Sequence, residues 1–249
     1  MMQQSKKSDL MPMSEQEPGS RQVALLQNLP ASPRREPSGL ATSELLRLQH
    51  AVSTRHNDWA EVTQFISTVE GDGCAQVAYD LGWISAAWLG KRVLFIDGTA
   101  MRLPATVGGA APARGRSRAV MPIMLPLDLQ AIESGLTKVA GLPMYQVALG
   151  GVRSPSEVPP AMTHVADVLA ALRHSFDLIL IASPPTRRGA FGVLLSRFVD
   201  NNVLVVRTGS TSKTAADDAA ETIRTAGGNV SGMVLTQHAN PVPRWLRWF

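Results

Sequence analysis

Cysteine is nearly absent from this chain. Cys74 is the only one among 249 residues, so no disulfide can form within the chain, which fits a reducing compartment. Long apolar runs are also missing. The longest, residues 77–89, carries Asp80, and we expect no helix that spans a bilayer. Lys6 and Lys7 near the N-terminus are not followed by an apolar core, so a secretory signal is not expected. These absences favour a cytoplasmic protein.

Charge of one sign is not in large excess. The sequence has 24 Lys and Arg residues against 20 Asp and Glu residues, which gives a formal net charge of +4 and a pI near 9.6. This excess is compatible with an anionic membrane surface. No basic stripe with interleaved aromatic residues runs along the central segments, so nucleic acid is not expected as a partner.

A glycine-rich segment lacks the residues that its context predicts. Ser67–Ala75 follows the strand-like run 62–66 and precedes the helix-like run 77–89, which is the strand, turn and helix context of a phosphate-binding loop. Such a loop places Lys and then Ser or Thr at its end, to hold the β- and γ-phosphates and Mg²⁺. Here Cys74 and Ala75 occupy those two positions.

Two later segments allow a family to be named. Residues 91–97 form an apolar strand that ends in Asp97, and residues 177–185 form a second one, in which Ala182 stands at the corresponding end. In this order the three segments resemble the cytoplasmic tyrosine-kinase or ATPase domain of bacterial polysaccharide co-polymerase systems. Members of that family typically read G-E-G-K-S-T, L-I-D-A-D-L-R-R-P and I-D-T-P-P at these places.

The resemblance covers most of the chain, from Thr42 to Gln237, because Asn201–Thr211 and Gly232–Thr236 look like the later strands of the family. It implies an α/β fold of the P-loop NTPase type, Rossmann-like, with a mainly parallel sheet and helices on both faces. The alternation of strands and helices predicts the same architecture. One example is the apolar run 144–149, which precedes an amphipathic helix over residues 162–174.

The resemblance also implies a nucleotide site. Its positions in this chain are Gly71, Gly73, Cys74, Ala75 and Asp97. In the family the loop Lys neutralises phosphoryl charge, the next hydroxyl ligates Mg²⁺, and acids at the strand ends organise the metal. Only Asp97 is kept, because Thr99 and Ala182 stand at the other acid positions. We therefore expect a degenerate nucleotide site with no catalytic residue, no metal and no cofactor. Retained binding of ATP and Mg²⁺ is the alternative.

Each of these residues also has a structural interpretation. Gly71 and Gly73 suit an ordinary tight turn, although a helix N-terminus can also bind an anion. Asp97 suits a helix cap or a turn. Cys74 suits a small apolar residue that fills space, although a helix dipole could stabilise its thiolate and make it reactive.

The two ends of the chain differ from its centre. Residues 1–40 are rich in Gln, Ser, Pro and mixed charges and predict a disordered arm, which precedes a P-loop-like domain over residues 41–240. The tail, residues 241–249, combines aromatic and cationic side chains that suit a membrane interface or a partner surface. It could instead fold back over its own domain. The residues expected to dock are Arg244, Trp245, Arg247, Trp248 and Phe249.

A helix is expected from Thr42 to about Ser53. In the family a helix at this place carries an E-x-x-R-x-x-R pattern that joins subunits into a ring. Glu44 and Arg47 match two of its three positions, and His50 departs from the third. A homo-oligomer through these residues is one interpretation, and a solvated helix face with a Glu–Arg pair is the other.

These departures favour a degenerate kinase or ATPase that acts by binding. We expect a cytoplasmic protein, or one peripheral at the inner membrane, that binds a membrane co-polymerase or a synthase and export complex in bacterial exopolysaccharide or capsular polysaccharide biosynthesis. Autophosphorylating members of the family carry a terminal tyrosine cluster, whereas the tyrosines here are Tyr79 and Tyr145. Two alternatives stay open: an active tyrosine kinase or ATPase of the same system, and a deviant-loop partitioning or cell-division ATPase. The latter needs a second Lys where this chain has Val69.

Overall fold

The computed structural model describes residues 26, 29–34, 42–53, 60–99, 129–149, 163–188 and 190–236. Its strands are β1 (Ala31–Ser32), β2 (Glu61–Ser67), β3 (Val93–Asp97), β4 (Thr137–Val139), β5 (Met144–Ala148), β6 (Leu178–Ala182), β7 (Asn201–Arg207) and β8 (Val230–Thr236). Its helices are α2 (Thr42–Val52), α3 (Cys74–Leu89), α4 (Leu129–Gly135), α5 (Thr163–Arg173), α6 (Ala190–Leu195) and α7 (Lys213–Thr225).

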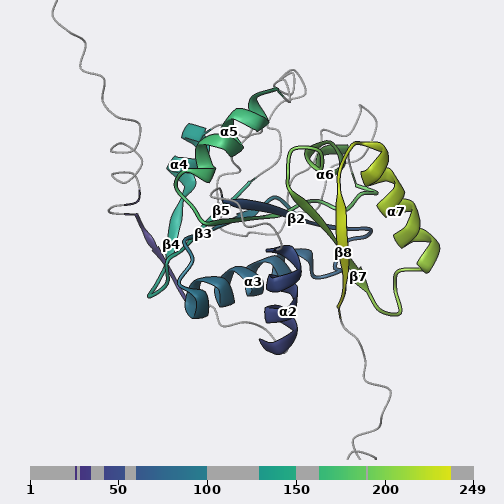
Figure 1. Ribbon diagram of the computed structural model, residues 1–249, viewed down its shortest axis with the longest axis horizontal. Coiled ribbons are helices and arrows are strands. Elements are labelled where there is room, and N and C mark those ends of the chain that lie inside the picture. Colours follow the sequence, from purple (N-terminus) through teal and green to yellow (C-terminus); the bar gives the residue numbers. More distant parts are fainter. Residues whose placement is uncertain are drawn as a thin grey trace, which may run out of the picture.

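The strands of the described part form one sheet in the order β1-β4-β5-β3-β6-β2-β7-β8 (Figure 1). All neighbouring pairs run parallel except β4 and β5. Strand β2 therefore lies between β6 and β7, and β3 lies on the far side of β6. The mainly parallel α/β sheet predicted from the sequence is confirmed.

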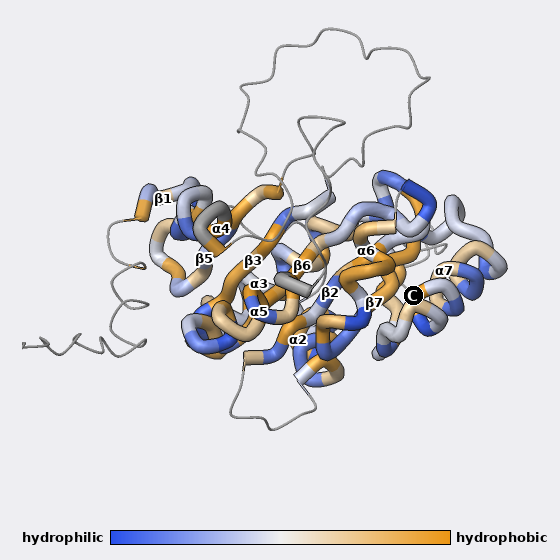
Figure 2. Tube along the Cα trace, turned by 90° about the horizontal axis from the view of Figure 1, so that it is seen from above, coloured by the Kyte–Doolittle hydropathy of each residue, from blue (hydrophilic) through white to orange (hydrophobic). Residues whose placement is uncertain are grey.

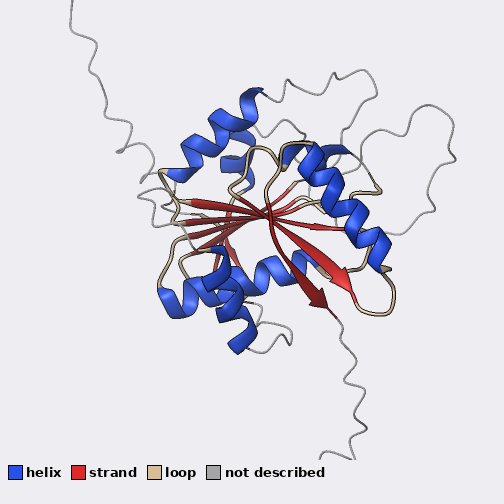
Figure 3. Ribbon diagram, turned by 45° about the vertical axis from the view of Figure 1, so that its right-hand side comes forward, coloured by secondary structure: helices blue, strands red, loops and turns tan. Residues whose placement is uncertain are grey.

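Helices cover the sheet on both faces (Figure 3). Side chains alternate between the faces of a strand, and β2 divides its side chains in this way. Phe65 packs in the cluster that contains α2 and α3. Val62 and Ile66 pack on the opposite face, in the clusters formed with α4 to α7. The parallel strands are thus buried on both sides, as continuous apolar runs require.

Strands β2 and β6 form the centre of the core. From Val62 to Ser67 every residue of β2 is buried, and all five residues of β6 are buried. Figure 2 shows the apolar strands inside and more hydrophilic stretches on the outer helices. The strand predicted to lead into the glycine-rich loop is therefore a central strand, which places the loop at the middle of the sheet edge.

A buried amide fixes helix α6 against this centre. Gln64 donates from Nε2 to Ser183 Oγ at 2.8 Å and to the Gly192 carbonyl at 2.7 Å. A Cβ atom on Gly192 would lie 2.9 Å from Ile66 Cδ1, so glycine is needed for the close approach of α6 to β2. The segment that follows β6 is held to β2 by these contacts.

Part of the expected N-terminal arm is folded, which corrects the boundary drawn at residue 40. Ala31 and Ser32 pair with β4 in parallel. Lys138 N–H donates to the Pro30 carbonyl at 3.0 Å, and Ala140 N–H donates to the Ser32 carbonyl at 3.1 Å. This strand has no apolar pattern of its own, and it was not predicted because its pairing partner lies more than a hundred positions away.

The expected tail, residues 241–249, lies outside the described residues, as does most of the expected arm. None of the helices in the described part of the chain has the length and apolar composition needed to cross a membrane.

Candidate functional site

The glycine-rich loop joins β2 to α3 in a left-handed conformation that glycine favours. Gly71 has φ +83° and Gly73 has φ +82°, values that a residue with a Cβ adopts only with strain. Gly73 is the residue before α3, and no side chain caps this helix end. The sequence prediction of a tight strand-to-helix turn is therefore confirmed at both glycines.

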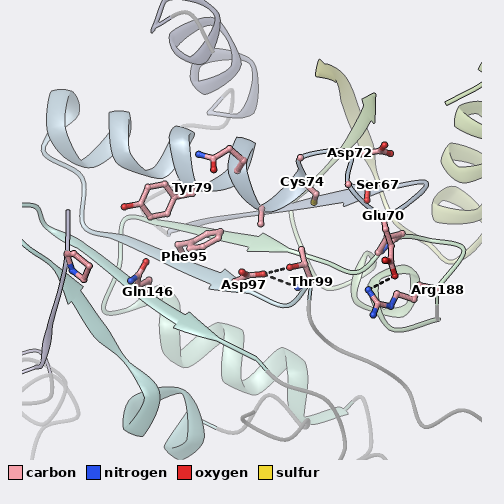
Figure 4. Close-up of a pocket in the computed structure, with 16 residues that line it drawn as sticks. Ser67, Glu70, Asp72, Cys74, Tyr79, Phe95, Asp97, Thr99, Gln146 and Arg188 are labelled. Atoms are coloured by element: carbon pink, nitrogen blue, oxygen red, sulfur yellow. Dashed lines mark hydrogen bonds and ion pairs between the residues drawn. The ribbon is translucent and has the colours of Figure 1, made fainter. Parts of the chain in front are cut away.

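Hydrogen bonds to Asp72 hold this loop in place. Asp72 is 1% exposed, and its Oδ2 accepts from Thr68 Oγ1 at 3.3 Å and from Val69 N–H at 3.4 Å. Thr236, the last residue of β8, donates from Oγ1 to the Asp72 carbonyl at 2.6 Å. The acidic side chain of the loop is therefore held by hydrogen bonds within the loop, and Asp72 also lines the cleft in front of α3 (Figure 4).

Cys74 begins α3 and is buried, with Sγ 3.8 Å from the Ser183 carbonyl. Burial raises the pKa of its thiol well above the ordinary value, and the nearby carboxylates of Asp97 and Asp72 act in the same direction. A raised pKa leaves little thiolate at neutral pH, so burial and electrostatics both favour the space-filling interpretation over a reactive thiolate. The side chain fills the position where a P-loop Lys would begin.

We predict that Cys74 reacts slowly with a thiol-labelling disulfide in the native protein. Each unit of pKa above that of a free thiol lowers the thiolate fraction roughly tenfold, and burial removes access as well. The measurement is the labelling rate at pH 8, with and without denaturant. Unfolding should raise the rate to that of a free cysteine, and equal rates in both conditions would contradict the burial.

Asp97 forms a local turn at the carboxyl end of β3. Its Oδ1 accepts from Thr99 N–H at 3.0 Å and from Thr99 Oγ1 at 2.6 Å. This is the turn-forming role anticipated for an Asp after a strand. Ala182 of β6 stands beside Asp97 in register and is fully buried. At the end of β6, the side chain beside Asp97 is therefore a methyl group and not a carboxylate.

These residues line an open cleft of about 680 Å³ at the carboxyl ends of β2, β3 and β6, where ligands bind in open α/β sheets. The structure brings all five sequence-predicted positions together there: Gly71, Gly73, Cys74, Ala75 and Asp97. The described residues contain no group of three or more His, Cys, Asp or Glu side chains arranged to hold a metal ion.

Two arginines lie near the loop and were not singled out from the sequence. Arg188, which follows β6, forms an ion pair with Glu70 at 2.6 Å across one end of the cleft (Figure 4). Arg207, at the end of β7, places Nη1 3.8 Å from the position that a Cβ on Gly71 would take. Neither has a sequence signal, because each lies more than a hundred residues after the loop in the chain.

The cleft also has a second half that the sequence did not predict. Tyr79 of α3 and Phe95 of β3 pack edge to face, with ring centroids 5.7 Å apart. Gln146 of β5 lies opposite Phe95 in the strand register, and Pro33 closes this side. The sequence analysis placed Tyr79 in a helix, Phe95 and Gln146 in two strands and Pro33 in the N-terminal arm, and no local signal linked these segments.

The predicted oligomer residues lie on α2 and do not line the cleft. Glu44, Arg47 and His50 are exposed, and Leu45, Gln49 and Val52 form the buried side of the helix. Within the described residues Glu44 and Arg47 form no ion pair with each other. These three side chains thus form an exposed face of α2, and the contact that would join subunits into a ring stays a prediction.

Comparison with known proteins finds similarity in structure only. No family model and no curated protein matches the chain. The BceF tyrosine kinase domain is 22% identical, with a TM-score of 0.56, over 78% of this chain and 74% of that one. The chimerical protein CapA2B2 is 17% identical, with a TM-score of 0.57, over 86% and 97% of the two chains. The kinase domain of the Escherichia coli tyrosine kinase ETK is 17% identical, with a TM-score of 0.58, over 82% and 79%.

These similarities and the strand order define the class of the fold. It is an α/β fold with a mainly parallel sheet, matching structures of the P-loop NTPase type, and the glycine-rich loop follows the interior strand β2. At this level of identity the similarity concerns the fold, and activity has to be argued from the site itself.

Proposed function

We propose that this protein is a catalytically degenerate relative of the bacterial tyrosine-kinase domains that it resembles, and that it acts by binding rather than by phosphoryl transfer. Its partner would be a membrane co-polymerase or a synthase and export complex of bacterial polysaccharide biosynthesis. The kinase domains with which it shares a fold support this assignment, as does the order of the family-like segments.

The first turn of α3 carries this proposal. A P-loop of this kind supplies a Lys to the phosphates and a hydroxyl to Mg²⁺, whereas here Cys74 is turned into the core and Ala75 has no polar group. Asp97 is the remaining acid, and Thr99 already occupies its Oδ1. A Lys–phosphate pair at about 4 Å contributes about 4 kcal/mol at an effective dielectric near 20, so its loss weakens nucleotide binding about a thousandfold.

One observation favours the alternative of retained nucleotide binding. Arg207 lies beside Gly71, and a guanidinium can bind phosphate oxygens in two places at once. The N–H groups at the uncapped start of α3 would also favour an anion. An ATP-binding switch that uses Arg207 in place of the loop Lys is therefore the second candidate function.

Calorimetric titration of Mg·ATP and Mg·ADP into the native protein tests the two candidates. We expect no saturable heat at millimolar nucleotide, because the cation, the metal hydroxyl and the second acid are absent. The matched control is Arg207→Gln. Saturable binding by the native protein that this variant loses would establish the second candidate in place of the first.

We predict that the aromatic tail drives recruitment. A Trp245→Ala, Trp248→Ala double variant should bind anionic vesicles or the partner membrane at least about tenfold more weakly, because interfacial tryptophans bury large amphipathic rings. Co-sedimentation with vesicles and with native membranes measures it. Trp88→Ala serves as the control, since Trp88 is 60% exposed on α3 and outside the tail. Equal recruitment of the tail variant and the native protein would contradict docking through the tail.

A further inference from the structure

The aromatic half of the cleft holds polar groups that no described residue satisfies. Asp97 uses Oδ1 for Thr99, and its Oδ2 has no hydrogen-bond partner among the described residues. The side-chain amide of Gln146 likewise has none there, since only its backbone carbonyl accepts a bond, from Thr137. Both side chains line the same cleft. Two unpaired acceptors around an aromatic wall suggest a ligand with several N–H donors.

Strand register explains why these groups share one face. Phe95 and Asp97 are two residues apart on β3, so both point toward α3. Gln146 is the register partner of Phe95 on β5. Tyr79 meets Phe95 from α3 above. Figure 4 shows Phe95 between Gln146 and Asp97, with Tyr79 over it. The carboxylate and the amide therefore flank the aromatic pair.

The charge of this half of the cleft is negative. Glu70 and Arg188 neutralise each other at the loop end. Asp72 and Asp97 both line the cleft, and neither forms an ion pair among the described residues. Asp72 bonds within the loop, so Asp97 is the carboxylate beside the aromatic pair. The N-terminus of α3 carries partial positive charge, but its effect is confined to the first turn. Tyr79 lies five residues into the helix, about 7.5 Å along its axis at about 1.5 Å per residue.

We propose that this half of the cleft binds the guanidinium group of an arginine side chain. A guanidinium is planar, stacks against aromatic rings and presents five N–H donors. It could therefore satisfy Asp97 Oδ2 and the Gln146 carbonyl oxygen together, with its apolar stem against Tyr79 and Phe95. Cys74 and Ala75, which line the same cleft, have small side chains. The cleft would then recognise a cation where its fold relatives have a nucleotide loop.

A divalent cation fits the same groups less well. Mg²⁺ requires near-ideal octahedral oxygen geometry and is usually held by more than one charged ligand, whereas Asp97 is here the single carboxylate facing the aromatic pair. The described residues offer no cluster of three ligand-type side chains. An aromatic wall also contributes nothing to a hydrated metal ion but does stabilise an organic cation.

Binding to the full-length native protein, followed by NMR or calorimetry, tests the proposal. The probes are N-acetylarginine methylamide, which represents arginine in a protein segment, and agmatine, which represents a free small molecule. N-acetylcitrulline methylamide is the neutral control of the same shape. We expect saturable binding of the arginine probes with Kd about 1 mM or lower, and binding of the citrulline probe at least about tenfold weaker, because the charge is lost.

Variants assign the binding to the cleft. Asp97→Asn should weaken arginine binding at least about tenfold through the loss of charge, and its remaining oxygen still accepts the bonds from Thr99. Gln146→Leu should weaken binding a few-fold and provides a second variant if the first does not fold. Glu221→Gln is the control, because Glu221 lies on α7 and is 73% exposed.

The two arginine probes distinguish the two kinds of ligand. Tighter binding of the arginine methylamide assigns the site to a protein segment, and tighter binding of agmatine assigns it to a small molecule. No saturable binding of either, equal binding of the citrulline probe, or unchanged affinity in both cleft variants would overturn the proposal. The result is independent of the proposed partner role, which the nucleotide titration and the tail variant test separately.

Discussion

A variant with Cys74→Lys, Ala75→Ser and Ala182→Asp is expected to bind Mg·ATP, whereas the native protein is not. The three changes introduce a loop cation, a metal-binding hydroxyl and a second acid at positions that line or border the cleft. The restored Lys alone contributes about 4 kcal/mol at an effective dielectric near 20, which is about a thousandfold in Kd. Calorimetry with Mg·ATP measures the gain.

The same variant should depend on Mg²⁺ for stability. Ala182 is fully buried and stands in register with Asp97, so Ala182→Asp places a second carboxylate beside the first. Like charges at this distance repel until a metal neutralises them. A ligand at about 100 times its Kd stabilises by about 2.7 kcal/mol, so Mg·ATP should raise the melting temperature by several degrees.

A matched control separates charge from volume in this experiment. Cys74→Met, Ala75→Ser and Ala182→Asn together add similar bulk without the Lys or the new carboxylate. This control should fold and should not bind Mg·ATP. Binding by the control would show that an enlarged loop is sufficient, and failure of a folded triple variant to bind would contradict the prediction that these three side chains suffice for Mg·ATP binding.

The sequence predicted the centre of the fold because several signals agreed there. The run 62–66, the two glycines and the run 77–89 each favour strand, turn and helix, and the structure places them as β2, the loop and α3. The left-handed glycines are a local property of the chain. Local properties are readable from one sequence because they depend on neighbouring residues.

The rest of the site could not be predicted because it depends on contacts between distant residues. The Glu70–Arg188 pair joins positions more than a hundred residues apart, and nothing in either segment indicates the other. Cys74 lies at a helix N-terminus, which favours a reactive thiol, but desolvation by burial has the largest effect on the pKa of its thiol and raises it. In the sequence, Gln146 is a single polar residue in a predicted strand. Only the strand register shows that it lies beside Phe95.

Strand β1 could not be predicted either, because it too depends on contacts with residues distant in the sequence. Two residues carry no periodic pattern, and the arm around them has the composition of a disordered segment. Their order comes from the edge of β4, which offers unpaired backbone groups. The prediction at Asp97 succeeded as a turn because Thr99 is only two residues away. Its unpaired oxygen became evident only with the cleft around it.

Replacement of Phe65 by Ala is expected to destabilise the protein by about 3–5 kcal/mol, the cost typical of removing a buried aromatic ring and leaving a cavity. Phe65 has no exposed surface and lies at the centre of β2, between Ala182 of β6 and Val203 of β7. Its carbonyl accepts from Ser183 N–H at 2.9 Å. Because a domain of this kind has about 5–15 kcal/mol of stability in all, this one change should remove a large share of it.

Urea denaturation measures this loss as a lower midpoint with an unchanged slope. Phe191→Ala is the matched control: Phe191 is only partly buried and packs on the opposite face of the sheet, so its ring leaves a smaller cavity and its loss should cost less. If Phe65→Ala cost no more than Phe191→Ala, β2 would not be the central strand. The loop that it carries would then not be positioned by the core, and both the cleft and its aromatic half would have to be placed elsewhere on the fold.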